Sequence, residues 1–229
     1  MNKKLPNYQS VDHSKTLSIS AFDLDHTLLA DNSSYSFLRY LYKEQHLSLG
    51  SLGFIIGSNL RYQAGLLSIP QLHKKAFDRL FKGRSSIFIK ERVDDFLQEN
   101  FERLLYLPAI EKLKLAQEAG HLTVILSSTP NFLVEPIAKK LKVTGWYATE
   151  YAIDIDNKFC RIAKLMLGEG KASILHELGA LYNVPNNQIH AYSDSHHDLP
   201  FLMAAGKAYG VNPNRKLRSI CRKNNWSII

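Results

Sequence analysis

The arrangement of apolar segments constrains the possible folds of this chain more than any other feature of its sequence. Short apolar stretches that suit buried strands run over residues 17–22, 121–126, 188–192 and 208–211. Helical patterns cover residues 108–119, 131–141 and 172–182, and a basic helix is expected over 213–223. Strands that alternate with helices predict a parallel sheet with helices on its faces.

The first two expected strands are separated by a long segment of helical character. Apolar residues recur at helical spacing from Ser33 to about Phe101, and the segment holds no convincing strand. Residues 147–162 are typical of a hairpin that turns at Asp156-Asn157. We therefore predict an α/β fold, a Rossmann-like parallel sheet core with an inserted all-helical cap. The expected boundaries are a flexible leader over 1–15, the core over 16–30 and 105–229, and the cap over 31–104.

Composition limits the classes of protein that this chain can belong to. It has 229 residues, of which 45% are hydrophobic and 22% charged, as in one globular domain with an insertion. Cys160 and Cys221 are too few for a disulfide framework and fit no common zinc spacing. No apolar run follows Lys3 and Lys4, and the apolar segment 47–60 is shorter than the roughly 20 residues that a membrane span needs. We expect free thiols and a cytoplasmic protein.

Polar side chains follow three of the expected strands at the point where each strand ends. Asp23 and Asp25 follow the first strand, Ser127 follows the second, and Asp194 follows the third, with Asp198 close behind. The carboxyl ends of parallel strands meet at one edge of a sheet, where such folds bind their ligands. An Asp-x-Asp pair alone is usually a solvated turn, but three strand ends that converge predict a catalytic site.

The motifs at these strand ends occur in an order that is known from one enzyme superfamily. Asp23-Leu24-Asp25-His26-Thr27 resembles the first signature of the haloacid dehalogenase-like hydrolases. Val124 to Ser127 resembles the second signature, Lys171 at the start of a helix the third, and Ser193 to Leu199 the fourth. A helical insertion between the first two signatures is similar to that of the phosphoserine-phosphatase-like branch.

The resemblance, together with the chemistry of phosphoryl transfer, assigns a role to each motif. Such a reaction needs a nucleophile, a proton donor for the leaving oxygen, and positive charge around the phosphoryl group. Asp23 is the expected nucleophile, which forms an aspartyl-phosphate, and Asp25 is the expected acid and base. The resemblance also implies that dehalogenase members lack an acid at the position of Asp25, which favours phosphate chemistry here.

The remaining motif residues are expected to bind metal or phosphate. Magnesium prefers hard oxygen ligands, which Asp23, the carbonyl of Asp25 and Asp194 would supply. Asp198 either binds the metal through water or holds Lys171 or a loop amide. Ser127 and Lys171 are expected to bind the phosphoryl group, with Lys164 as the alternative lysine. Thr27 is expected to orient the loop or contact phosphate, and its alternative is a helix cap.

The expected function is hydrolysis of a small phosphomonoester. The sequence Ser127-Ser128-Thr129-Pro130 departs from the Ser-Gly-Gly of phosphoserine phosphatases, so phosphoserine, histidinol phosphate and lipid-derived head groups all stay as candidate substrates. One alternative is a phosphatase of phospholipid precursors whose segment 47–60 meets the membrane surface. A second alternative is a non-catalytic protein that binds a phosphorylated metabolite.

Other features of the sequence have simpler explanations. His196 and His197, with His190, are interpreted as residues near the pocket mouth rather than as a metal site, and residues 154–157 as a turn rather than a calcium loop. The net charge of +8 is spread over several clusters, which favours a surface that attracts anionic substrates over nucleic-acid binding. Arg39, Arg61 and Arg84 are candidates for binding an anionic substrate.

Overall fold

The computed structural model describes residues 17–229, and the predicted leader over residues 1–15 lies outside this range. The described chain forms a seven-stranded sheet in the order β4-β3-β2-β1-β5-β6-β7. Its strands are β1 (Ile19–Phe22), β2 (Leu122–Pro130), β3 (Gly145–Ile153), β4 (Phe159–Lys164), β5 (Ile189–Ser193), β6 (Lys207–Gly210) and β7 (Ser227–Ile228). All neighbours are parallel except β3 and β4, which form the predicted hairpin.

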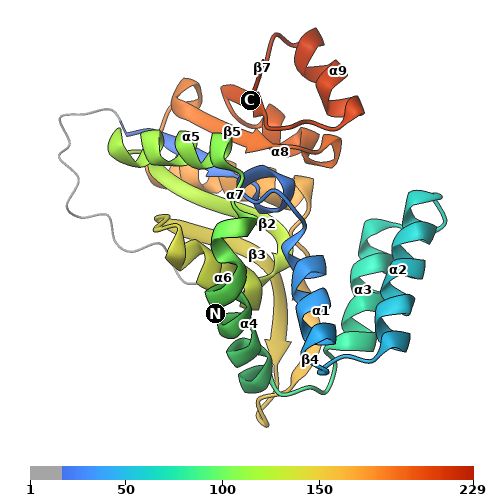
Figure 1. Cartoon of the computed structure of the whole chain (residues 1–229). Helices are drawn as coiled ribbons and strands as arrows, with labels where there is room; N and C mark the ends of the chain where they lie inside the picture. The colour runs from blue at the N-terminus through green and yellow to red at the C-terminus, as the bar shows by residue number, and fades with distance from the viewer. Residues whose placement is uncertain (1–16) are drawn as a thin grey trace.

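Helices cover both faces of this sheet (Figure 1). One face packs against α5 (Leu107–Glu118) and α6 (Asn131–Lys140), and the other against α7 (Gly168–Leu181), α8 (Leu199–Met203) and α9 (Arg215–Lys223). Successive residues of β1 divide between the two layers, since Ala21 joins the core beneath α7 and Phe22 the core beneath α6. Burial on both faces explains why the central strands are continuously apolar.

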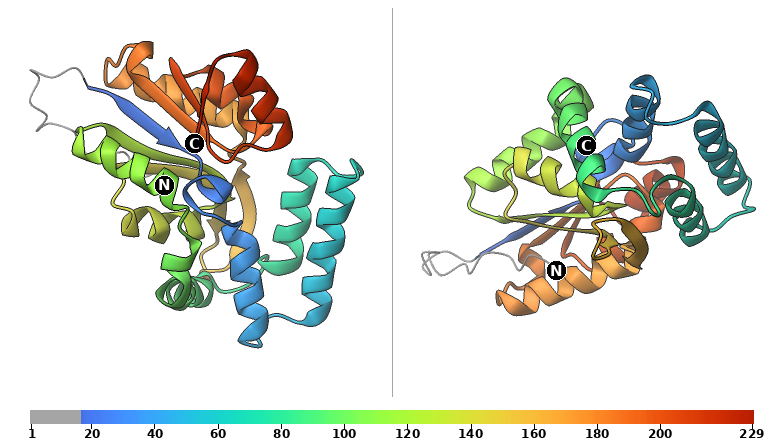
Figure 2. Two further views of the ribbon diagram at one scale, coloured as in Figure 1. Left: turned by 45° about the horizontal axis from the view of Figure 1, so that its top comes forward. Right: turned by 90° about the horizontal axis from the view of Figure 1, so that it is seen from below.

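The inserted segment over residues 31–104 is helical, as predicted. It holds α1 (Ser33–Lys43), α2 (Leu49–Gln63), α3 (Ile69–Leu80) and α4 (Ser86–Leu104). α1 and α4 pack beside α6, with the rings of Phe37 and Phe96 5.6 Å apart. α2 and α3 form a hairpin that projects from the rest of the molecule, with α2 outermost (Figures 1 and 2). The predicted fold class is confirmed, and the domain boundaries remain predictions.

The β3–β4 hairpin braces the inserted helices. The amide of Gly83 donates to the carbonyl of Phe159 at 2.8 Å, and the rings of Phe77 and Tyr151 lie 4.8 Å apart, edge to face. Aromatic rings from both parts therefore share one core. This contact fixes the base of the α2–α3 hairpin against the sheet.

Two details of the sheet differ from the prediction. β2 was expected to end at Leu126, but it runs on to Pro130 with a register irregularity between these residues. β7 was not predicted, because a strand of two residues has no periodic pattern. Both cysteines are free, as expected. None of the helices between residues 17 and 229 combines the length and apolarity that crossing a bilayer requires.

Candidate active site

A buried lysine joins two aspartates at the carboxyl edge of the sheet. Nζ of Lys171, in the first turn of α7, lies 2.6 Å from Oδ1 of Asp23 and 2.6 Å from Oδ2 of Asp198. The three side chains are at most 9% exposed. The structure thus brings together residues from the end of β1, the start of α7 and the loop after β5. Lys164, the alternative lysine, is exposed on β4.

A glycine makes the contact between α7 and the loop after β5 possible. Gly168 is the first residue of α7, and a Cβ atom there would collide with the carbonyl oxygen of His197. The helix start can therefore approach the loop backbone closely only with glycine at this position. This approach places Lys171 within reach of Asp198.

Asp25 lies in the tight turn that follows β1, and both of its carboxylate oxygens are bound. Oδ1 accepts a hydrogen bond from the amide of Ser33 at 2.8 Å, and Oδ2 accepts one from Oγ1 of Thr129 at 2.7 Å. His26, the next residue, has a φ of 59°, in the left-handed region that non-glycine residues rarely adopt. This turn directs Asp25 towards the inserted helices.

The hydroxyls of Thr27 and Ser127 accept hydrogen bonds from backbone amides near the strand ends. Oγ1 of Thr27 accepts a hydrogen bond from the amide of Asp194 at 3.1 Å, which connects the turn after β1 to the end of β5. Oγ of Ser127 accepts from the amide of Thr129 at 3.1 Å, inside the irregular part of β2. The first of these bonds joins Thr27 to the loop that carries Asp194, and the role of Thr27 stays a prediction.

Burial and mutual repulsion dominate the electrostatics of the carboxylates. Burial raises the pKa of Asp23 from 3.8 to about 7, although Lys171 opposes this shift. Burial, followed by the charges of Asp23 and Asp198, raises the pKa of Asp194 to about 8. Burial alone would lower the pKa of Lys171, but Asp198 and Asp23 raise it above its ordinary value. Lys171 is therefore a permanent cation.

The charge balance of this cluster suits a divalent cation. One buried lysine faces Asp23, Asp194 and Asp198, so the carboxylates carry more charge than Lys171 compensates. No group of three or more His, Cys, Asp or Glu side chains between residues 17 and 229 is arranged to hold a metal ion. The expected ligand set, the side-chain carboxylates of Asp23 and Asp194 and the backbone carbonyl of Asp25, stays a prediction.

A cavity of about 590 Å³ lies beside Asp25, between the sheet edge and the inserted helices. Asp25, Ser128 and Thr129 line it, and most of the other lining residues come from α1, α2 and α3. Arg39 lines the cavity, but Arg61 and Arg84 do not, and Arg84 instead donates to the carbonyl of His46 at 3.3 Å.

The sequence analysis missed two residues of this cavity, His73 and Thr129. His73 of α3 lines it, and burial lowers its pKa, against the opposing effect of Asp25. Tyr62 of α2 contacts Nε2 of His197 through its hydroxyl at 2.9 Å, so the α2–α3 hairpin touches the loop after β5. Thr129, in contact with Asp25, followed a predicted strand end, and this position was the one available signal for it.

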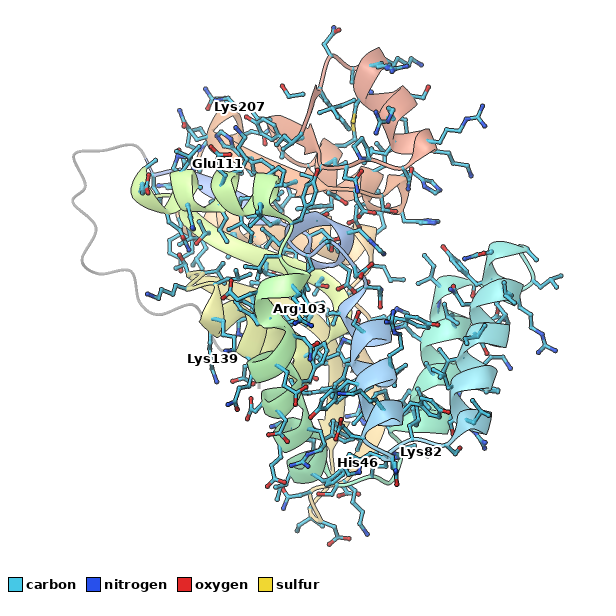
Figure 3. The ribbon with its side chains drawn as sticks, in the orientation of Figure 1. His46, Lys82, Arg103, Glu111, Lys139 and Lys207 are labelled. Carbon is cyan, nitrogen blue, oxygen red and sulfur yellow. The ribbon has the colours of Figure 1, made fainter. Side chains whose placement is uncertain are left out.

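The basic residues are dispersed over the fold, as predicted. Lys82 in the turn after α3, Lys139 on α6 and Lys207 on β6 lie far apart (Figure 3).

A parallel sheet with an inserted helical cap and a carboxylate–lysine cluster at its strand ends defines a class of capped α/β hydrolases. The chain belongs to the haloacid dehalogenase-like hydrolases, since the profile of that family matches residues 21–203. The predicted family is therefore confirmed.

Several other proteins and solved structures resemble this chain. A probable phosphatase of Mycobacterium tuberculosis is 28% identical over 216 residues, which are 91% of this chain and 73% of that protein. A histidinol-phosphatase of Neisseria meningitidis is 26% identical over 222 residues, covering 92% of this chain and 97% of that protein. A substrate-bound phosphoserine phosphatase structure superposes with a TM-score of 0.67 at 17% identity, covering 90% of each chain. These matches confirm the predicted enzyme class, a phosphomonoester hydrolase.

Proposed function

We propose that this protein is a magnesium-dependent phosphatase that hydrolyses a small phosphomonoester through an aspartyl-phosphate at Asp23. The observation that carries the proposal is the buried cluster of Asp23, Lys171 and Asp198, next in the chain to Asp25, which lines a cavity. The three residues of the cluster come from the end of β1, the start of α7 and the loop after β5, which chance arrangement of surface charges does not produce.

Asp23 is the proposed nucleophile. Its amide donates to the carbonyl of Tyr192 at 2.9 Å, which fixes its backbone to β5. Lys171 binds Oδ1, and Oδ2 is the oxygen that we assign to attack phosphorus. Lys171 holds the carboxylate in orientation and stabilises its charged form, and its positive charge also favours the phosphoryl oxygens. Asp198, together with Ser193, keeps Lys171 in place: Oγ of Ser193 donates to Oδ2 of Asp198 at 2.8 Å.

Asp25 is the proposed acid and base. It lines the cavity, where a leaving group would lie. The hydroxyl of Thr129 can donate a hydrogen bond to the Asp25 carboxylate and can accept one from the carboxylic acid, so this contact persists in both protonation states. Asp25 would protonate the leaving alkoxide and then remove a proton from the water that attacks the aspartyl-phosphate.

The proposed cofactor is magnesium, held by the carboxylates of Asp23 and Asp194 and by the carbonyl of Asp25. A bound divalent cation supplies charge neutralisation between the carboxylates and the phosphate dianion. Thr27 contributes by fixing the amide of Asp194. Ser127 is the proposed donor to the phosphoryl group.

The proposed substrate is a small phosphorylated metabolite. A cavity of about 590 Å³ is in the range of small-molecule sites. Arg39 gives it a cation for an anionic leaving group, and His73 gives it a hydrogen-bonding side chain. The relatives named histidinol-phosphatase and phosphoserine phosphatase make these phosphomonoesters the first compounds to test. We place the enzyme in the cytoplasm.

The test is phosphate release from a panel of phosphorylated metabolites and an aryl phosphate, with and without magnesium. We expect turnover that requires the metal, and its loss in Asp23→Asn. Asp156→Asn, in the exposed β3–β4 turn, is the matched control and should keep full activity. Full activity in Asp23→Asn would contradict the nucleophile assignment. Absence of turnover with every compound would favour the alternative of a non-catalytic phosphometabolite-binding protein.

A further inference from the structure

Helix α2 presents its apolar side to solvent and its serines to the protein. Its buried residues are Ser51, Ile55 and Ser58. On its outer side Leu49 is 67% exposed, Ile56 41% and Leu60 60%. A surface helix of a globular protein normally has the opposite arrangement, with its apolar stripe on the core.

The exposed residues form one continuous stripe along the helix. Positions 49, 53, 56, 60 and 64 follow one another at steps of four and three, which places them on a single face. Gly53 and Gly57 have open space around them and keep this face smooth. Leu66, 72% exposed in the turn after α2, extends the stripe to the tip of the hairpin. Contiguous exposed apolar surface of this kind marks a site of interaction.

The position of α2 leaves this face accessible. α3 lies between α2 and the sheet, and the outer side of α2 faces away from the rest of the molecule in every view (Figures 1 and 2). Three other residues of α2, Ile55, Asn59 and Gln63, line the cavity. The stripe residues Leu49, Ile56 and Leu60 are not part of the cavity wall.

The charges of the hairpin are almost entirely positive. No Asp or Glu occurs between Glu44 and Asp78 in the sequence. The hairpin carries Arg61 at the end of α2 and three cations on α3, which are Lys74, Lys75 and Arg79. Lys74 is paired with Asp78 at 2.7 Å, on the exposed surface. An apolar helical face without carboxylates, on a hairpin that carries an excess of cations, is complementary to a membrane with anionic lipids.

We propose that the outer face of α2, with Leu49, Ile56, Leu60 and Leu66, docks this protein on an anionic lipid membrane. The helix would lie in the plane of the interface with these side chains among the acyl chains and the cations of the hairpin near the head groups. Docking of this kind needs neither a membrane-spanning helix nor phosphatase activity, so its test is independent of the proposed function.

A second copy of the chain fits this face less well. A helix of 15 residues is about 22 Å long and about 10 Å wide, so it offers about 220 Å² per copy. A stable interface buries about 800 Å² on each partner. A symmetric pairing of the two hairpins would also bring like charges together, because Arg61 and the lysines of α3 would face their equivalents.

The experiment is flotation of the full-length protein with vesicles of phosphatidylcholine alone and with vesicles that also contain phosphatidylglycerol. We expect binding to the anionic vesicles that weakens as salt is added. The triple variant Leu49→Gln, Ile56→Gln, Leu60→Gln should bind at least about tenfold more weakly, because three apolar side chains no longer enter the lipid. Leu181→Gln, which changes a 71% exposed leucine at the end of α7, is the matched control and should bind like the wild type.

Three results would overturn the proposal. One is a wild-type protein that stays unbound with both kinds of vesicle at low salt. Another is binding of the triple variant that is as strong as that of the wild type. Loss of binding on replacement of Arg215 and Lys216 would then place the membrane contact on α9. A third is a wild-type dimer in solution that the triple variant converts to a monomer, since the face would then be an interface between copies. Unchanged hydrolysis of a soluble aryl phosphate by the triple variant shows that it is folded.

Discussion

Replacement of Lys171 by methionine removes the one cation between two buried aspartates. Methionine keeps most of the volume of lysine, so the change isolates the loss of charge and hydrogen bonding. Lys171 Nζ lies 2.6 Å from both Asp23 and Asp198, and all three side chains are at most 9% exposed. The variant therefore leaves two carboxylates buried, close together and without their counter-ion.

The expected cost follows from these distances. At 2.6 Å and an effective dielectric constant of about 20, one such pair gains about 6 kcal/mol of Coulomb energy, of which desolvation offsets a large part. Removal of one partner from a buried pair typically costs about 3–5 kcal/mol. Lys171→Met should lower the free energy of unfolding by this amount at about pH 8, where Asp23 is ionised in the wild type.

The pH dependence of the loss separates charge from packing. At about pH 5 the unpaired carboxylates can bind protons, so Lys171→Met should lose less stability there than at about pH 8. Adding Asp198→Asn to the variant should restore part of the stability at the higher pH, because one of the two charges is gone. Urea denaturation without divalent cations measures all of these free energies.

An exposed lysine of β4 provides the control for the Lys171 variant. Lys164→Met, on the exposed side of β4, should change the free energy of unfolding by less than about 0.5 kcal/mol. If Lys171→Met were as stable as Lys164→Met at about pH 8, the claim that Lys171 compensates the buried aspartates would be wrong. A loss of equal size at both pH values would point to packing alone.

Three further predictions concern other parts of the site. The pKa of Asp23 is raised to about 7 and that of Asp194 to about 8, so the metal-free folded protein keeps protons that the unfolded chain has already released. Its free energy of unfolding should therefore fall as pH rises from about 4 to about 8, by up to about 1.4 kcal/mol per pH unit per carboxylate. Asp194→Asn should flatten this slope in urea titrations, and an unchanged slope contradicts the raised pKa of Asp194. Gly168→Ala should lower the free energy of unfolding by about 1–3 kcal/mol, because its Cβ meets the carbonyl of His197. Gly57→Ala, in open space on α2, is the control and should be neutral or stabilising. Equal denaturation midpoints for the two variants would refute the close approach between α7 and the loop after β5. Arg39→Met should raise KM for an anionic substrate about tenfold with little change in kcat, whereas Arg61→Met, outside the cavity, should leave KM unchanged. A raised KM in Arg61→Met and not in Arg39→Met would exclude Arg39 as a substrate contact.

The sequence predicted the parts of the fold that depend on local periodicity. Continuous apolar runs identified β1, β2 and β5, and their polar ends identified Asp23 and Asp194, because a strand buried on both faces has a distinct pattern and a defined end. The order of the motifs then identified the family. Lys171 was predicted from its motif, and its two ion pairs became visible only with the fold.

Contacts between distant segments were beyond the reach of sequence patterns. Thr129 and Asp25 are 104 residues apart in the chain, and no local signal pairs them. His73 reaches the cavity because of how α3 packs, which periodicity does not define. The same holds for α2: the sequence shows an apolar segment interrupted by serine and glycine, but tertiary packing decides that Ser51 and Ser58 face inward and Leu60 outward.

The central claim is that Asp23 carries the phosphoryl group during turnover, and the most direct measurement is to find that group. The wild-type enzyme is mixed with magnesium and a phosphomonoester that it hydrolyses, quenched in acid during turnover, digested and examined by mass spectrometry. We expect phosphorylation of the peptide that contains Asp23, at the end of β1, and its absence from Asp23→Asn. A phosphoryl group on any other residue, or phosphate release by Asp23→Asn at the wild-type rate, would contradict the account.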